Sequence, residues 1–207
     1  MGLPLFNNRP ANFPCPRYDA ATCDPFGDHL VCCKHNNFSA RHGAVQECLL
    51  ESLRAANQPV EREQPLSREN GRRVLREHLR PADLLWKQWV GGKDVAVDVT
   101  VCHPLQRAEL PWSVAKCNTF LKRKEEAKIV KYADPCALEG WDFLPMAFTT
   151  WGSSGPQAFP LLRKIFRRAA MWADADTRPE VIADLHNKLS VALFRQMVSL
   201  LQPILLV

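Results

Sequence analysis

The sequence lacks any apolar run of the roughly 18 residues that cross a bilayer. Its most apolar stretch, residues 189–207, is interrupted by Arg195 and Pro203. Residues 7–10 read Asn-Asn-Arg-Pro where a secretory signal needs an apolar segment, and Gly2 lacks the Ser or Thr of a myristoylation site. We therefore expect no membrane span, no export and no lipid anchor, which predicts an intracellular protein.

Internal repeats and low-complexity segments are also lacking, which excludes solenoid and collagen-like architectures. With 46% hydrophobic and 24% charged residues, the chain can bury a core, so wholesale disorder is excluded. Its 207 residues suit one domain, or one domain with an appendage. The net charge of +5 is a mild basic bias that would suit a polyanionic partner.

No Cys-x-x-Cys pair occurs, yet four of the eight cysteines crowd the N-terminus together with histidines. Clustered Cys and His in a chain without a secretory signal are typical of tetrahedral zinc rather than disulfides. We predict Cys15, Cys23, His29 and Cys33 as ligands, with Cys32 competing for the last place and His35 or His42 as less favoured replacements. Four protein ligands leave no position for water, so the zinc would be structural. The alternative is a set of free buried thiols.

Hydrophobic periodicity predicts alternating helices and strands, and therefore an α/β fold. The pair Gly91-Gly92 favours a tight hairpin between two strands. The predicted helices are residues 40–57, 113–132, 156–173 and 179–201, and the predicted strands are 83–90, 93–102 and 141–151. The charged stretch 58–80 is interpreted as a solvated surface. We divide the chain into a zinc knot (12–37), a core (38–173) and a C-terminal helical extension (174–207).

Two aspartates fall on the predicted hairpin. A turn at Gly91-Gly92 would place Asp83 opposite Thr100 and Leu85 opposite Asp98, so that the two aspartates become diagonal neighbours on one face. Converging carboxylates repel each other unless a cation or a proton intervenes, and their hard oxygen atoms favour Mg²⁺ or Mn²⁺. A charged residue such as Asp98 among strand valines also requires a partner. The sequence thus predicts a divalent metal site.

Three short motifs, in this order, resemble the PD-(D/E)XK nuclease superfamily: Arg80-Pro81-Ala82-Asp83, Asp98-Val99-Thr100-Val101 and Lys128-Ile129-Val130-Lys131-Tyr132. The wider series adds the Cys/His knot with Gly27-Asp28-His29, then Arg41-His42, and the stretch from Phe143-Leu144-Pro145 to Gly152. This series, over about residues 15–170, is similar to the restriction-like endonuclease region of certain non-LTR retrotransposon polyproteins.

The resemblance implies a restriction-endonuclease-like mixed β-sheet flanked by helices, with metal-dependent hydrolysis of DNA at Asp83 and Asp98. The superfamily's usual lysine position holds Thr100, so the following helix would supply the ammonium from Lys128 and Lys131, which spacing alone does not separate. Glu47 or Glu51 would add a carboxylate. Candidate nucleic-acid contacts are Arg41, His42, Arg80, Arg163 and Arg167. The implied partners are DNA and the rest of a polyprotein, in the nucleus, and the sequence's start shortly before the knot suggests a fragment.

Three functions remain open from the sequence. The first is the metal-dependent endonuclease. The second is a domesticated, catalytically inactive domain that binds nucleic acid, which Thr100 favours. The third is a structural interaction domain, in which the two aspartates would be coincidental and the basic faces at residues 122–131 and 163–168 merely solvated.

Overall fold

The computed structural model describes residues 12–33, 38–64, 80–105 and 117–205. Four strands form the central sheet in the order β3 (Val60–Gln64), β4 (Ala82–Val90), β5 (Lys93–Cys102) and β6 (Asp142–Thr149). The first three are antiparallel, and β6 runs parallel to β5. The fold is therefore mixed α/β, as the sequence predicts, although β3 lies within the stretch interpreted as solvated surface.

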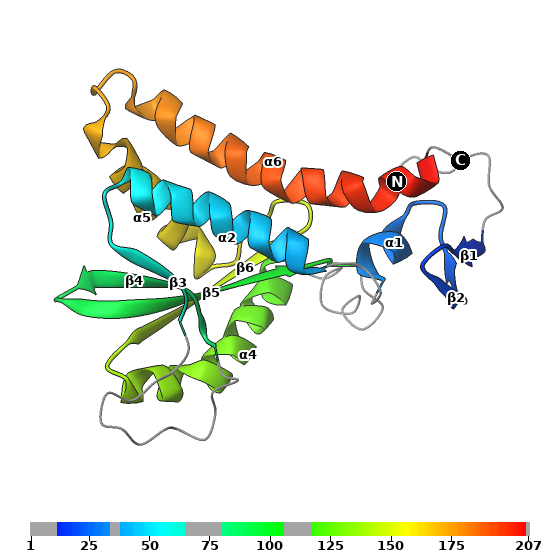
Figure 1. Ribbon diagram of the computed structural model, residues 1–207, viewed down its shortest axis with the longest axis horizontal. Helices are drawn as coiled ribbons and strands as arrows, with labels where there is room; N and C mark the ends of the chain where they lie inside the picture. Colours follow the sequence, from blue (N-terminus) through cyan, green and yellow to red (C-terminus); the bar gives the residue numbers. More distant parts are fainter. Residues whose placement is uncertain (1–11, 34–37, 65–79, 106–116, 206–207) are drawn as a thin grey trace.

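Helices cover both faces of the sheet (Figure 1). On one face lie α2 (Phe38–Ala55), α5 (Ala158–Ala169) and α6 (Arg178–Leu205), and on the other lies α4 (Cys117–Leu138), the crossover between β5 and β6. The period-two alternation of β5 explains this arrangement. Val95, Val97 and Val99 point into the main core under α2 and α5, whereas Ala96 packs toward α4.

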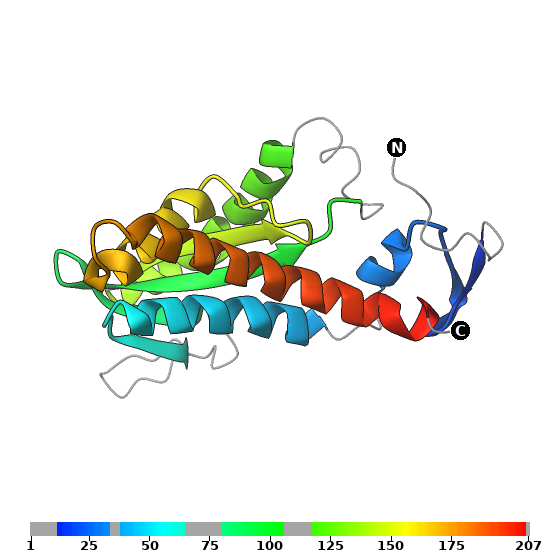
Figure 2. The ribbon, with the colours of Figure 1, turned by 90° about the horizontal axis from the view of Figure 1, so that it is seen from above.

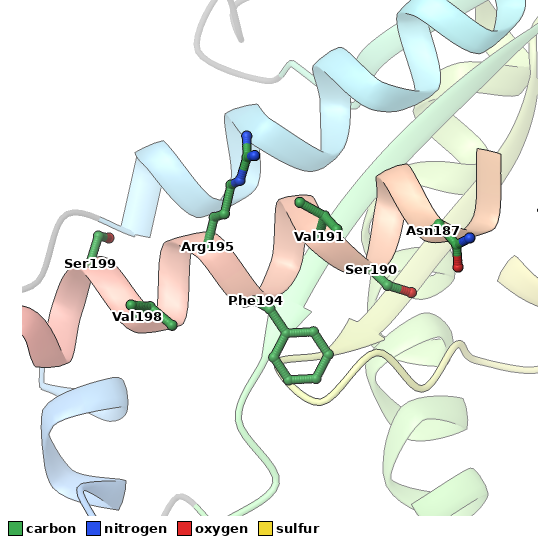
Figure 3. A pocket seen from close by; sticks show the side chains of 7 residues that line it. All are labelled: Asn187, Ser190, Val191, Phe194, Arg195, Val198 and Ser199. Atoms are coloured by element: carbon green, nitrogen blue, oxygen red, sulfur yellow. The ribbon is translucent and has the colours of Figure 1, made fainter. Parts of the chain in front are cut away.

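Two further elements extend the sheet's layers. A short 3-10 helix, η1 (Ala170–Trp172), follows α5, and α6 then returns along α2 with Leu185, Leu189 and Leu193 buried in the main core. The outer face of α6 bears a largely apolar groove of about 440 Å³, beside which Phe194 and Arg195 point to different sides of the helix (Figure 3). None of the described helices is both long and apolar enough to cross a membrane.

The N-terminal part is a small unit of its own at the end of α6 (Figure 2). It consists of a hairpin, β1 (Phe13–Cys15) and β2 (Tyr18–Cys23), followed by α1 (Asp28–Cys32). Its buried residues form a separate cluster that includes Phe13, Leu30 and Val31, against which Met197 of α6 packs. The small size of this cluster is consistent with the predicted need for a metal.

The predicted hairpin is confirmed, but its predicted register is wrong. Leu85 pairs with Ala96, not with Asp98, and the register shifts between Trp86 and Val90. The cause is a bulge at Gln88, whose φ is 54° and whose backbone amide donates to Asp94 Oδ1 at 3.0 Å. Extending the pairing of Leu84 with Val97 by one residue sets Asp83 directly opposite Asp98.

A buried carboxylate joins α4 to β6 and to the start of α5. Glu125 accepts the backbone amides of Gln157 at 2.9 Å, Ala158 at 3.0 Å and Ala147 at 3.4 Å. Burial raises the pKa of Glu125 above its usual value, and the three amides oppose that rise. The carboxylate fills the space beside Gly155, where a Cβ would overlap it. This contact ties the crossover helix to the sheet.

We expect Gly155→Ala to lower the free energy of unfolding by about 1–3 kcal/mol, because overpacking would push a carboxylate that three amides hold in place. Gly43→Ala is the matched control. No atom lies within 4 Å of a Cβ at that position in α2, so replacing a helical glycine should stabilise the protein by up to about 1 kcal/mol. Urea unfolding followed by circular dichroism measures both, and equal effects of the two variants would contradict the role assigned to Glu125.

Candidate functional site

An acidic pair lies where β4 begins and β5 approaches its end, on the face that α4 covers. Asp98 is 3% exposed, and Lys128 of α4 donates to both of its carboxylate oxygens, at 2.8 Å to Oδ2 and 3.0 Å to Oδ1. The Thr100 hydroxyl lies 3.4 Å from Oδ2. Strand β5 and helix α4 thus present one carboxylate and one ammonium group to the same small volume.

Asp83 completes the pair from the neighbouring strand. Its Oδ2 accepts the backbone amide of Val99 at 2.6 Å and contacts His42 Nε2 at 2.9 Å. His42 Nε2 also lies 3.0 Å from the Val99 carbonyl oxygen. Because both neighbours of Nε2 are acceptors, this nitrogen carries a proton. Among the described residues, both of these contacts of the Asp83 carboxylate involve Oδ2, so Oδ1 is the oxygen that could bind a cation.

The charges of this group are mutually dependent. Burial raises the pKa of Asp98 above its usual value; Lys128 lowers it again, and the nearby Asp83 carboxylate raises it further. The hydrogen bond to Asp83 raises the pKa of His42 above its usual value, against the effect of burial. Two carboxylates at this spacing favour cations around them, and a divalent ion would satisfy both.

The two candidate lysines have different positions. Both ammonium groups lie near the Tyr132 ring, at 5.5 Å from its centre for Lys128 and 4.7 Å for Lys131. Among the described residues, however, only Lys128 forms an ion pair with Asp98. The structure therefore brings Asp83, Asp98 and Lys128 together, and Lys131 is not part of the group. Glu47 is paired with Arg62 at 2.8 Å on the surface, and Glu51 is also exposed, so the additional carboxylate implied by the resemblance is not placed at the pair.

The candidate nucleic-acid contacts divide into three groups. Arg41 is only 4% exposed, so its side chain lies inside the protein, away from any surface that a nucleic acid reaches. His42 contacts Asp83 at the acidic pair, and Arg80 is exposed just before β4. Arg163 and Arg167 are exposed on α5, which covers the opposite face of the sheet from α4.

Sequence reasoning missed His103, which follows β5 directly. It is buried, its Nδ1 lies 2.6 Å from the Thr150 hydroxyl, and its Nε2 lies 3.4 Å from Asp28 Oδ1. Burial lowers the pKa of His103 below its usual value, and Asp28 opposes that shift. A histidine directly after a buried strand was the available signal. Its contact with Asp28 connects the central sheet to α1.

The second site lies in the N-terminal unit. Single ligand atoms of Cys15, Cys23 and His29 all lie within 4.8 Å of one another, a grouping that can hold a metal such as zinc. Cys33 Sγ lies 3.8 Å from Cys15 Sγ. Two sulfurs bound to one tetrahedral zinc lie about 3.8 Å apart, so Cys33 has this spacing to Cys15, although it lies outside the group of three whose ligand atoms are all within 4.8 Å of one another.

Two observations fit a metal at these residues. His29 Nε2 is buried and has no hydrogen-bond partner among the described residues. Burial and then the neighbouring Cys15 raise the pKa of Cys23 to about 12, which an ion would reverse by stabilising the thiolate. Cys32 is half-buried and lies in the electrostatic environment of Asp28 and Arg41. His35 lies outside the described residues, and His42 belongs to the acidic pair.

The local sequence also fixes how this unit turns. Asp24 accepts the backbone amides of His29 at 2.7 Å, Phe26 at 2.9 Å and Asp28 at 3.1 Å, which holds the loop before α1. Gly27 has a φ of 81°, which favours glycine at the start of that helix. This loop presents His29 to the two cysteines of the hairpin.

Comparison with known proteins adds no relative. No protein-family model matches the chain, and no curated protein is similar to it. We therefore infer the function from the geometry of the two sites.

Proposed function

We propose that this protein is a metal-dependent endodeoxyribonuclease of the restriction-endonuclease-like kind, with a structural zinc knot at its N-terminus. The observation that carries the proposal is the convergence of Asp83, Asp98 and Lys128 from two adjacent strands and the crossover helix. It agrees with the resemblance of the motifs, in which a helix provides the lysine that Thr100 replaces on the strand.

The donor set suits Mg²⁺ or Mn²⁺, since both aspartates offer hard oxygen atoms. Such an ion, when bound, lowers the pKa of a water molecule and neutralises charge on the phosphate. Asp83 and Asp98 would hold the ion. His42 fixes Asp83 Oδ2 in place through its Nε2 proton, and Oδ1 would be the oxygen that binds the ion.

Lys128 has two tasks in this proposal. It balances the charge of the buried Asp98, and its side chain is 31% exposed, so that its ammonium could donate to a phosphate oxygen as negative charge develops there. Loss of one preorganised donor of this kind typically lowers turnover by about 10²–10³-fold.

The alternative is an inactive domain that binds nucleic acid. One observation favours it: Lys128 contacts both oxygens of Asp98 and so occupies positions that an ion needs. In an active enzyme, the Lys128 ammonium must release one of the two Asp98 oxygens so that this oxygen can bind the metal. Cleavage assays separate the two functions.

The test is nicking of supercoiled plasmid by the full chain, with Mg²⁺ or Mn²⁺ added to a metal-free buffer. A strong chelator is avoided because it would also remove zinc. We expect Lys128→Met to reduce nicking by about 10²-fold or more, and Lys131→Met, three residues along the same helix, to change it less than about threefold.

Each outcome decides between the proposals. Metal-dependent nicking that depends on Lys128 supports the endonuclease. Salt-sensitive DNA binding without nicking would support the inactive binding domain, and absence of both activities would reject both. Equal losses in the two lysine variants would contradict the assignment of Lys128.

A further inference from the structure

A second charged surface lies on α5, away from the acidic pair. A groove of about 400 Å³ is lined by Pro160, Arg163, Lys164, Arg167, Arg168 and Met171. The helix itself, Ala158–Ala169, contains no acidic residue. Four positive charges thus share one helix face without an acidic residue in that helix.

This concentration of charge is unfavourable for the isolated fold. Arg163 with Arg167, and Lys164 with Arg168, are like-charged pairs four residues apart, which destabilise a helix. Burial and then the charge of Arg168 lower the pKa of Lys164 below its usual value, in line with repulsion between these neighbouring cations. A bound polyanion would remove this repulsion.

Aromatic rings lie against three of the four cations, and the first is Arg163, whose guanidinium is 5.8 Å from the centre of the Phe159 ring. The Lys164 ammonium lies 3.5 Å from the centre of the Trp89 ring. The Arg168 guanidinium lies 5.4 Å from the Trp86 ring and donates to Gln58 Oε1 at 2.5 Å. Preorganised cations lose less conformational entropy when they bind phosphate. Arg163 and Arg167 are exposed and complete the row.

An exposed aromatic residue lies next to the groove in the chain. Trp172 of η1 follows Met171 and is 76% exposed, which is unusual for so large an apolar side chain. A cationic groove together with an exposed aromatic side chain is the combination that binds single strands, in which phosphates pair with cations and bases stack on rings.

We propose that the α5 groove binds the backbone of a single-stranded nucleic acid, with Trp172 as a stacking surface for a base. The site is separate from Asp83 and Asp98, because α5 and α4 cover opposite faces of the sheet (Figure 1). The inference goes beyond the proposed hydrolysis and does not depend on it.

An anionic membrane is the rival partner for a basic helix with apolar neighbours. A helix that lies on a membrane inserts its apolar face among the lipids. The apolar face of α5 is already occupied, since Leu161, Leu162, Ile165 and Phe166 are buried in the main core. Arginine also pairs with phosphate oxygens through two parallel hydrogen bonds, which suits a nucleic-acid backbone.

The test uses fluorescence anisotropy of a labelled single-stranded DNA of mixed sequence with the full chain, without divalent metal, over a salt series. We expect Arg163→Gln/Arg167→Gln to weaken binding about tenfold or more at low salt and to reduce the slope of log affinity against log salt by about 1.4, the value for two phosphate contacts on a single strand. We expect Trp172→Ala to weaken binding about 5- to 150-fold with the slope unchanged.

The matched control is Lys188→Gln/Arg195→Gln, which removes the same charge from exposed positions of α6. If the control variant loses as much affinity as the α5 variant, net charge alone explains the effect and the proposal is overturned. Tighter binding of the matched duplex, or binding of phosphatidylserine vesicles that the α5 variant loses, would also overturn it. Plasmid nicking is measured separately with the same variants, so that a failure of single-strand binding is distinguished from a failure of the proposed nuclease.

Discussion

Replacement of Asp98 by Asn is expected to lower metal-dependent plasmid nicking by about 10³-fold or more, while the protein remains folded. Asp98 offers a negatively charged oxygen to the proposed ion, and a neutral amide is a much weaker ligand for Mg²⁺ or Mn²⁺. The same change should weaken Mn²⁺ binding measured by calorimetry. Binding of the ion and cleavage should thus be lost together.

The stability of this variant follows from the same environment. Burial raises the pKa of Asp98, so its ionised form is less favourable in the folded protein than in the unfolded chain. A group with a raised carboxyl pKa favours the folded state as pH falls below the folded pKa, and this contribution is lost as pH rises through it. Asn removes that unfavourable charge. Lys128 keeps access to water, so we expect the free energy of unfolding to change by less than about 1 kcal/mol.

The control for this experiment is Asp142→Asn. Asp142 lies on the neighbouring strand β6, about half exposed, with its carboxylate 3.9 Å from the Lys93 ammonium. It removes the same charge from the same sheet without touching the acidic pair, so nicking should be unchanged. An Asp98→Asn protein that still nicks at the wild-type rate would reject the proposed metal site.

At the acidic pair, the sequence predicts the hairpin but not its register. Gly91-Gly92 predicts the hairpin correctly because both glycines adopt positive φ, 62° and 79°. The register fails because the bulge at Gln88 depends on Asp94, a side chain whose contact is not visible in a pattern of apolar residues. The shift moves Asp83 from a diagonal position to one opposite Asp98. The two carboxylates are therefore direct cross-strand neighbours, an arrangement closer than the diagonal one that the sequence predicts.

The two lysines of α4 illustrate a second limit. Lys128 and Lys131 lie three residues apart, so helical spacing alone allows either to reach the sheet. The choice depends on how α4 crosses β5 and β6, which buries Tyr132 against Phe143 and directs Lys131 over the Tyr132 ring. The sequence also does not predict strand β3. Its burial pattern is mostly exposed, so its charged residues give no apolar alternation.

In the N-terminal unit, the sequence identified candidate metal ligands but not the hairpin and helix that carry them. Cys15, Cys23 and His29 converge as predicted. The hairpin of β1 and β2 was not predicted, because such short strands carry no hydrophobic period. The sequence predicts Cys33 with the adjacent Cys32 as its competitor, and the structure places Cys33 Sγ 3.8 Å from Cys15 Sγ but outside the close group of Cys15, Cys23 and His29. This difference makes the fourth ligand testable.

Removal of zinc is expected to unfold the N-terminal unit and leave the main core intact. The unit's buried cluster is small, whereas a structural zinc typically supplies about 10–16 kcal/mol of apparent binding free energy at neutral pH. The main core under α2 and α5 contains none of the proposed ligands. Limited proteolysis of the metal-free protein should therefore cut within residues 12–33 and spare the sheet, as circular dichroism would verify.

The cysteine variants decide which residues hold the ion. We expect one zinc per chain in the wild type, loss of zinc in Cys15→Ser and Cys33→Ser, and retention in Cys32→Ser, the adjacent matched control. Replacement of zinc by Co²⁺ gives an independent count, since the sulfur charge-transfer absorption should indicate three thiolates and fall in Cys33→Ser. Loss of zinc from Cys32→Ser with retention in Cys33→Ser would reverse the assignment. A wild-type protein without zinc after expression in zinc-supplied medium would leave these residues as buried thiols.

Because Asp28 of the same unit contacts His103, which directly follows β5, we expect zinc loss also to expose His103 to solvent.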